Sequence, residues 1–379
     1  MSKYLWIIPA DVLLFRNGRP FEQGGDHYAE SVFPPAPSVL YGALRTAGIA
    51  SSGASFTDFI TGKSASNVAQ AYGSPMRHGE FNITSVFLGR NQEPLFPTPF
   101  DLVSPKQNAS SHITLLQPLR DTGFTSSLHP SLFPLWTKKD GILAHNPGFL
   151  TLEQFQAYLS GQVPVRYLTD SEVRQTENRT GVALDPETGA VRTGMLYTAQ
   201  YVRIFDKSLS DQFGFIVGYR GDNGSPLPTS GWLRLGGESR PAHFVQLDSC
   251  DYPLAPDFSN GRFKLVLATP ALFENGWLPR GIRKENGALI FKDSECGISA
   301  KLVAAAIGKA VPIGGWDIAN RRPKSIFPAV PAGSVYFFEL QSGTNDAVKQ
   351  KFHGCCISDF AKTSWEGFGL TFIGGWNYV

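Results

Sequence analysis

The chain has 379 residues, of which 42% are hydrophobic and 17% are charged, and its formal net charge is only +2. This composition excludes a disordered tail and a strongly basic protein that coats DNA, and the length allows two domains with sizeable cores. The 39 glycines and 27 prolines indicate many loops and turns around a modest amount of regular structure.

The cysteines and the N-terminus exclude further classes. Two of the four cysteines, Cys355 and Cys356, are adjacent, none forms a C-x-x-C pair, and no histidine stands at zinc-ligand spacing from them. The apolar run 5–8 ends at Pro9 and Asp11, so it is too short for a signal peptide or a membrane span. We therefore expect a soluble cytoplasmic protein with buried thiols and with no metal, no cofactor and no membrane partner.

The first two thirds of the chain predict a strand, a helix, a strand, a second helix and a final strand. These elements are expected at Lys3–Phe15, Pro37–Ala47, Asn82–Leu88, Thr151–Leu159 (with Thr151 as N-cap) and Leu233–Leu247. Long insertions interrupt this order, and the sequence does not indicate a role for the insertion Leu95–Pro134. Two β-prone runs within 177–203 flank the turn Asp185–Gly189, which predicts a long projecting hairpin.

The last third predicts the order βαββαβ. Its elements are expected at Phe263–Thr269, Ser299–Ile307 (helix), Ala310–Trp316, Ser334–Leu340, Asn345–Phe352 (helix, capped by Asn345) and Gly367–Trp376. This split βαβ plan is shared with RNA-recognition motifs. We therefore predict an α+β fold with two ferredoxin-like domains, residues 1–258 and 259–379, with long insertions and the 177–203 hairpin as a thumb.

The first helix carries candidate RNA-binding residues. Ser38, Tyr41 and Arg45 fall on the face opposite its apolar stripe, and a hydroxyl, a ring and a guanidinium suit contacts with phosphates and bases. A solvated helix face with a packed tyrosine explains the same pattern equally well. Upstream, Arg19 flanks the turn Asn17–Gly18, where it could reach a phosphate or pair with an acidic neighbour.

Three glycine-rich segments and the hairpin supply the other candidates. The segments are LGGESR (235–240), IGGWDIANRRPK (313–324) and GFGLTFIGGW (367–376), and none matches a Walker loop or a dinucleotide-binding fingerprint. Glycines allow close approach of backbone N–H groups to phosphates, and an indole can stack on a base, although ordinary turns explain each segment alone. The candidates are Gly237, Arg240, Gly315, Trp316, Arg321 and Lys324, together with Asn178 and Arg179 from the hairpin.

Taken together, these motifs resemble the RAMP (repeat-associated mysterious protein) superfamily. More narrowly, the chain is similar to the RAMP subunit that binds the 5′ handle of the crRNA in the type III-B CRISPR (Cmr) effector complex. The resemblance is carried across nearly the whole chain by FRNGRPF, FPPAPSVLYGALR, ENRTGVALDPETGAVRTGMLYTAQYVR, LGGESRPA, LATPALFENGWLP, GGWDIANRRPK, VPAGSVYFFEL and GFGLTFIGGW. It implies an antiviral, non-catalytic RNA-binding subunit that contacts crRNA, the large polymerase-like signature subunit and the backbone RAMP subunits.

Three alternatives stay open. Some RAMP proteins are metal-independent endoribonucleases that process crRNA, and His27, with Asp26 and Tyr28 beside it, is the candidate acid or base here. The glycine-rich loops could instead contact only protein, as in a structural scaffold. The chain could also be the equivalent subunit of a type III-A complex.

Overall fold

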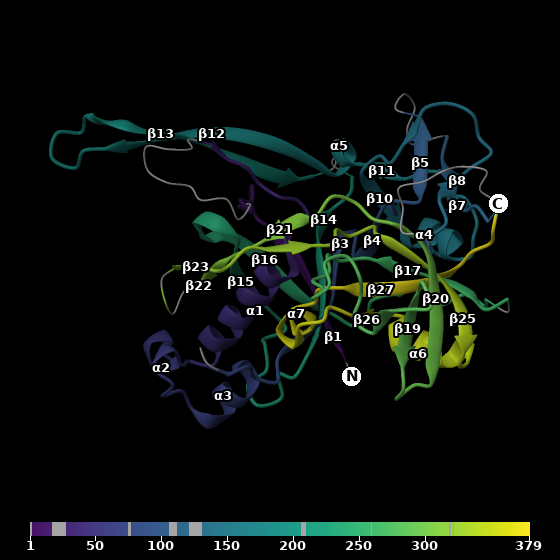
Figure 1. Ribbon diagram of the computed structural model, residues 1–379. Helices are drawn as coiled ribbons and strands as arrows, with labels where there is room; N and C mark the ends of the chain where they lie inside the picture. The colour runs from purple at the N-terminus through teal and green to yellow at the C-terminus, as the bar shows by residue number, and fades with distance from the viewer. Residues whose placement is uncertain are drawn as a thin grey trace.

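A computed structural model describes residues 2–16, 28–74, 77–105, 112–120, 131–205, 210–258, 260–317, 320 and 322–379. Within these ranges the protein is a strand-rich α+β structure whose core lies on two antiparallel sheets (Figure 1). The first sheet has the order β11 (Leu168–Thr169), β10 (Gly148–Thr151), β4 (Glu93–Pro97), β3 (Asn82–Arg90), β14 (Phe213–Arg220), β1 (Lys3–Pro9), β16 (Arg240–Leu247) and β15 (Ser230–Leu235). The second has the order β18 (Ile282–Glu285), β19 (Ala288–Asp293), β20 (Ile298–Ala306), β25 (Val335–Ser342), β17 (Arg262–Leu267), β27 (Leu370–Gly375) and β26 (Cys355–Cys356).

The two sheets repeat one arrangement of four strands. In the first, β1 lies between β14 and β16, and β3 pairs with the far side of β14. In the second, β17 lies between β25 and β27, and β20 pairs with the far side of β25. Each half has one well-formed helix at a corresponding crossover: α1 (Pro37–Ser51) follows β1, and α6 (Asn345–Phe352) precedes β26 and β27.

The predicted helix Ser299–Ile307 is wrong, because this segment is strand β20. Ile298, Ala300 and Leu302 belong to one buried cluster, whereas Val303, Ala304 and Ala306 belong to another. A register irregularity between Leu302 and Ala304 separates the two sets. A strand that is covered on both faces is apolar throughout, so its sequence has no alternation to distinguish it from a buried helix.

Three other expectations need correction. The predicted strand Leu233–Leu247 is a hairpin in which the short helix η1 (Gly237–Ser239) joins β15 to β16. The N-cap of α6 is Thr344, whose side chain accepts a hydrogen bond from the Ala347 N–H at 3.1 Å, rather than Asn345. The cysteines are free thiols, but Cys296 is exposed, while burial raises the pKa of Cys356 to about 12.

Helix α4 (Leu152–Leu159) begins as predicted but lies between the two sheets. Thr151 caps it by accepting a hydrogen bond from the Gln154 N–H at 3.4 Å. Phe155 on α4 stacks on Phe96 of the first sheet with 4.2 Å between ring centroids, and it meets Phe372 of the second sheet edge-on at 5.7 Å. One hydrophobic cluster therefore contains residues from both halves. The domain boundary at residue 259, which lies outside the described ranges, stays a prediction.

The predicted hairpin is confirmed. Strands β12 (Arg174–Leu184) and β13 (Val191–Ile204) pair along their length and project from the body of the molecule (Figure 1). At the tip, the Asp185 side chain accepts hydrogen bonds from the N–H groups of Glu187 and Thr188, both at 3.0 Å. At the base, β13 pairs with the short strand β2 (Tyr28–Ala29).

The remaining elements are short. The insertion after β4 forms β5 (Leu102–Pro105), β6 (Thr114–Leu115), β7 (Gln117–Pro118), β8 (Leu135–Trp136) and β9 (Leu143–Ala144). Elsewhere lie α2 (Phe56–Ile60), α3 (Ser66–Tyr72), α5 (Asp170–Val173), β21 (Val311–Ile313), β22 (Trp316–Asp317), β23 (Arg322–Pro323), β24 (Phe327–Ala329) and α7 (Ala361–Trp365). In the described part of the chain, no helix has the length and apolar character needed to cross a bilayer.

Candidate RNA interface

Tyr41 does not lie on a solvated helix face. Its side chain is 7% exposed and belongs to the core of the first half. The ring stacks on His78 with 6.0 Å between centroids, and the hydroxyl lies 3.1 Å from His78 Nε2. Burial raises the pKa of Tyr41 to about 12. The predicted orientation is wrong at this position because the segment after α3 covers the face of α1 that the sequence leaves open.

Arg45 is used inside the fold. Its Nε donates to the Tyr72 carbonyl at 2.7 Å, a second guanidinium nitrogen donates to the Ser74 carbonyl at 3.2 Å, and the guanidinium lies 5.0 Å from the centre of the Phe59 ring. Burial lowers the pKa of Arg45. This arginine therefore joins α1 to the end of α3. Ser38, in the first turn of α1, is half-buried.

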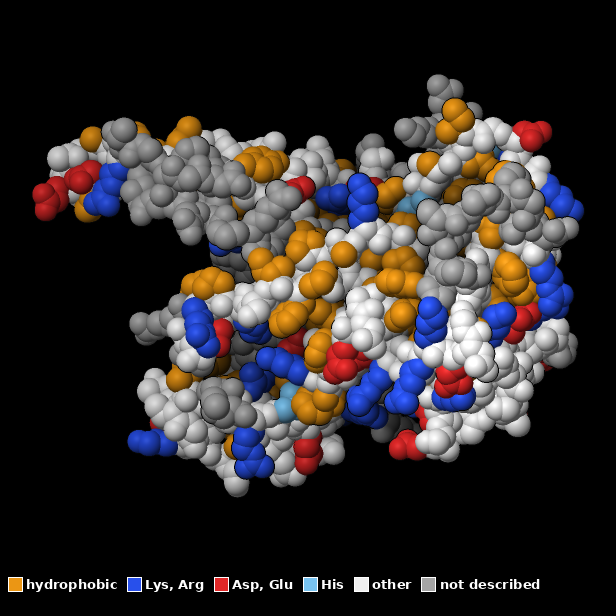
Figure 2. Space-filling view, in the orientation of Figure 1, with side chains coloured by type: hydrophobic (Ala, Val, Ile, Leu, Met, Phe, Trp, Pro, Cys, Tyr) orange, Lys and Arg blue, Asp and Glu red, His pale blue; other side chains and the backbone are white. Residues whose placement is uncertain are grey.

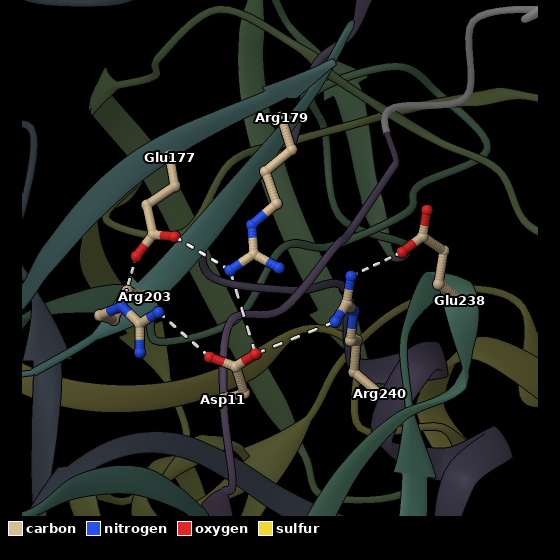
Figure 3. Close-up of polar contacts among 6 residues, drawn as sticks. All are labelled: Asp11, Glu177, Arg179, Arg203, Glu238 and Arg240. Atoms are coloured by element: carbon tan, nitrogen blue, oxygen red, sulfur yellow. Dashed lines mark hydrogen bonds and ion pairs between the residues drawn. The ribbon is translucent and has the colours of Figure 1, made fainter. Parts of the chain in front are cut away.

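The arginines at the base of the hairpin form a closed charge cluster, which we call the thumb-base network (Figure 3). Its members are Asp11, Glu177, Arg179, Arg203, Glu238 and Arg240. Three guanidinium groups face three carboxylates, and Asp11 lies among all three arginines, at 3.1 Å from Arg203. A hydrogen bond from the Val12 N–H and the nearby Arg203 lower the pKa of Asp11.

Two further candidates at the hairpin base also have partners within the protein. Asn178 Oδ1 accepts a hydrogen bond from the Tyr28 hydroxyl at 3.4 Å. The Gly237 N–H donates to the Leu14 carbonyl at 2.7 Å. The preceding Gly236 has φ 72°, and a Cβ there would lie 2.5 Å from the same Leu14 oxygen. The paired glycines therefore serve close packing of two backbone segments.

The other described candidates lie on a second surface, which we call the aromatic–basic face. We define it as Trp316, Arg322, Lys324, Phe327, Phe360, Lys362 and Trp365, all of which are exposed. Figure 2 shows Lys and Arg side chains interleaved with hydrophobic ones in the region that Figure 1 labels β22, β23 and α7.

Contacts between distant segments hold this face together. Trp316 pairs with Pro323 across the β22–β23 ribbon, and the Lys324 N–H donates to the Gly315 carbonyl at 2.9 Å. The rings of Phe327 and Phe360 lie 6.5 Å apart, which joins β24 to the segment before α7. On the other side of α7, Trp365 packs on His78 with 4.0 Å between centroids.

The cations of this face differ from those of the thumb-base network. Within the described ranges, Arg322, Lys324 and Lys362 form no ion pair with a carboxylate. The Trp316 side chain beside them is 57% exposed. Unpaired cations next to exposed rings can bind a polyanion that also carries flat aromatic groups.

The structure leaves some candidates undescribed and adds others. Arg19, Arg321 and the alternative catalytic residue His27 lie outside the described residues. Sequence analysis missed Phe327, Phe360, Lys362 and Trp365. Phe327 follows the third glycine-rich candidate segment and could have been found by extending it, whereas α7 reaches this surface only through the tertiary fold. Among described residues, no group of three His, Cys, Asp or Glu side chains could hold a metal ion.

Comparison with known proteins identifies the family. No curated protein sequence matches the chain significantly. The chain is similar to a subunit in two cryo-EM structures of the type III-B Cmr-beta complex: one bound to cognate target RNA (TM-score 0.51, 19% identity, covering 96% of this chain and 95% of that chain) and one bound to cognate target RNA and AMPPnP (TM-score 0.51, 18% identity, 96% and 94%). At these identities the likeness concerns the fold. A family model described as CRISPR-associated protein (Cas_Cmr3) matches residues 5–376. The chain therefore belongs to the CRISPR-associated Cas_Cmr3 family, which confirms the resemblance to a Cmr RAMP-type subunit.

Proposed function

We propose that this protein is a non-catalytic subunit of a type III-B CRISPR RNA-guided effector complex, and that its aromatic–basic face binds the 5′ handle of the crRNA in antiviral defence. The observation that carries the proposal is the combination of exposed rings with cations that no described carboxylate neutralises. Stacking on an aromatic side chain contributes about 1–3 kcal/mol per base, and unpaired cations gain free energy by releasing the counterions of phosphates. A single strand supplies both groups.

The thumb-base network supports this choice of surface by contrast. Arg179 and Arg240 each already contact carboxylates, at 3.1 Å and 2.7 Å. A phosphate would have to displace those partners, so the gain from binding there is smaller. We therefore assign Trp316, Lys324 and Gly315 to RNA binding and keep Arg179, Arg240, Asn178 and Gly237 as supports of the thumb.

The β12–β13 hairpin fits a protein partner. Val182, Leu184, Val191 and Leu196 on its two strands are all exposed. Such apolar side chains on a projecting hairpin are typical of an interaction site. We assign this surface to the adjacent backbone RAMP subunit, and we place the large polymerase-like signature subunit on the remaining surface of the same complex.

The repeated strand order supports a duplicated fold. We propose that residues 1–258 and 259–379 are two ferredoxin-like domains that each retain one crossover helix, α1 or α6. The other crossover of each domain contains a β-hairpin, β15–β16 in the first and β18–β19 in the second. This loss of a helix explains why the sequence order only partly matches βαββαβ.

Binding experiments with matched variants test the proposed function. The purified chain, with labelled 5′-handle RNA, should bind without cutting it. Trp316→Ala should weaken binding roughly 5- to 150-fold, the equivalent of about 1–3 kcal/mol. Lys324→Ala should weaken it and make it less dependent on salt.

The controls are an exposed tryptophan and an exposed lysine elsewhere, Trp232→Ala on the sheet edge and Lys284→Ala on β18, which should bind like the unaltered protein. If Trp316→Ala and Lys324→Ala also bind like the unaltered protein, the proposed function is wrong. If the RNA is cut, and the cutting is lost in His27→Ala, the endoribonuclease alternative replaces it.

A further inference from the structure

A buried carboxylate without a partner lies beneath the aromatic–basic face. Glu366 follows the last residue of α7 and is 7% exposed. Its backbone N–H donates to the Lys362 carbonyl at 3.2 Å. Among the residues that the structure describes, no donor lies within hydrogen-bond or ion-pair distance of its carboxylate oxygens. Buried polar groups almost always have partners, so an unpartnered one indicates a ligand that the isolated chain does not hold.

Three cations from three segments surround this carboxylate at longer range. Arg45 approaches from α1, Lys362 from α7 and Lys324 from the segment after β23, and their charges favour the ionised form of Glu366. The Arg45 guanidinium is already engaged by two carbonyl groups. Lys324 and Lys362 are exposed. The cations therefore hold a negative charge in place without occupying its acceptor oxygens.

This arrangement restricts the chemistry of the ligand. A metal ion, a lysine or an arginine would be repelled by Arg45, Lys324 and Lys362 at close range. A neutral group that donates hydrogen bonds meets no such repulsion. An ionised carboxylate has two acceptor oxygens and no donor, so it suits a ligand with two adjacent N–H groups.

Among nucleobases, only guanine has two adjacent donors, N1–H and the 2-amino group, on its Watson–Crick edge. Adenine and cytosine place a ring-nitrogen acceptor beside their amino group, and uracil flanks its single N–H with two carbonyls, so each would turn an acceptor toward the carboxylate. Trp365, the residue before Glu366, is exposed and braced by the His78 ring, and thus offers a stacking surface next to the carboxylate. Lys324 and Lys362 can meet the phosphates of the same strand.

We propose that Glu366 determines specificity by accepting two hydrogen bonds from a guanine base of the bound RNA strand. The inference rests on the proposed function and deepens it, because it assigns one nucleotide type to one side chain. Glu366 binds the base directly, while Lys324 and Lys362 bind phosphates irrespective of sequence.

The test measures the affinity of the purified chain for short oligouridines that carry one guanine, moved through every position. In at least one register the guanine oligonucleotide should bind roughly tenfold or more tightly than the adenine oligonucleotide or plain oligouridine, as expected for two buried hydrogen bonds to a charged group. Inosine at the same position lacks the 2-amino group and should lose most of this gain. Glu366→Gln has only one acceptor and should lose the preference while it keeps its affinity for plain oligouridine.

The controls separate this inference from the proposed function. Lys362→Ala should weaken the binding of every oligonucleotide to a similar extent and keep the preference for guanine. Thermal unfolding verifies that Glu366→Gln is folded, and Glu366→Asp, which retains a carboxylate, should keep part of the preference. The inference is overturned if guanine gives no gain in any register, or if Glu366→Gln retains the gain. A chain that binds no oligonucleotide, or that is unaffected by Trp316→Ala, would instead contradict the proposed function.

Discussion

The Lys264 ammonium lies 3.1 Å from the Asp101 carboxylate at a site where both side chains are almost completely buried. Lys264 belongs to β17 of the second sheet, whereas Asp101 follows β4 of the first, so the ion pair joins the two halves of the chain. The Tyr158 hydroxyl of α4 also donates to Asp101 at 2.6 Å, and the Lys264 Nζ lies 3.5 Å from the centre of the Tyr158 ring.

Removing one member of this buried pair should destabilise the whole protein. Lys264→Met leaves the Asp101 charge buried without its cation, and we expect the free energy of unfolding to fall by about 3–5 kcal/mol. Denaturant unfolding measures the loss. Adding Asp101→Asn to Lys264→Met removes the orphaned charge but keeps an acceptor for the Tyr158 hydroxyl, so it should restore part of the stability. A double variant that is less stable than Lys264→Met would contradict this account.

The thumb-base network should restrain, rather than promote, RNA binding. Asp11→Asn removes one of three carboxylates and leaves three arginines, so we expect a higher affinity for any single-stranded RNA and a steeper dependence on salt. The cost in stability should be no more than about 1 kcal/mol, because the network is partly exposed and screened by solvent. An affinity that falls in Asp11→Asn would show that the network itself is the RNA site.

The same network sets a dependence of stability on pH. Arginine neighbours lower the pKa of Glu177, as backbone and arginine contacts lower that of Asp11. A carboxyl whose pKa is lowered on folding stabilises the protein above its unfolded pKa and loses this contribution as the pH falls through the lowered value. The stability difference between the unaltered protein and Asp11→Asn should therefore be present at neutral pH and disappear below the ordinary carboxyl range of about 4. A difference that persists in acid would contradict the ion-pair assignment.

Arg45 should affect stability and not RNA affinity. Arg45→Ala removes two hydrogen bonds from a charged group to the carbonyls of Tyr72 and Ser74, and we expect a loss of about 2–4 kcal/mol in the free energy of unfolding. Affinity for handle RNA, measured well below the unfolding temperature, should change by less than about twofold, since the guanidinium faces protein. A large loss of affinity in a folded Arg45→Ala protein would return this residue to the RNA site.

The preference for guanine should depend on pH through Glu366. Burial raises the pKa of this carboxyl, although Lys324, Lys362 and Arg45 oppose the rise and the neighbouring Tyr41 stays neutral. Protonation turns an acceptor into a donor, so the preference should be full at alkaline pH and fade as the solution is acidified through the raised pKa. Titration of His78 in a similar range is separated by His78→Gln, which should leave the fading unchanged. A preference constant from alkaline pH to below 4 would contradict the role of an ionised Glu366.

Local sequence patterns predicted the elements with a distinct apolar face or a strong turn signal. The strands β3, β17 and β25 and the β12–β13 hairpin lie where the sequence indicates. Failure came where tertiary contacts decide. Segment 299–307 is a strand because both its faces are covered, and α4 leaves its expected place because Phe155 completes a cluster between the sheets.

The candidate site was predicted in the same uneven way. Trp316 and Lys324 are exposed, as a turn rich in glycine and charge suggests, and their segment supplies part of the aromatic–basic face. Tyr41 and Arg45 have equally suitable chemistry but are enclosed by α2, α3 and the segment after α3, which helical periodicity alone cannot reveal. Lys362 and Trp365 join Lys324 only because α7 packs beside α1.

Photocrosslinking in the assembled complex tests the central claim most directly. The crRNA carries 4-thiouridine in its 5′ handle, and the crosslinked peptides of this chain are identified by mass spectrometry. We predict crosslinks to peptides that contain Trp316, Phe327 or Trp365, and their loss in Trp316→Ala. Crosslinks confined to other surfaces, such as the β12–β13 hairpin, with the aromatic–basic face covered by another subunit, would contradict the account.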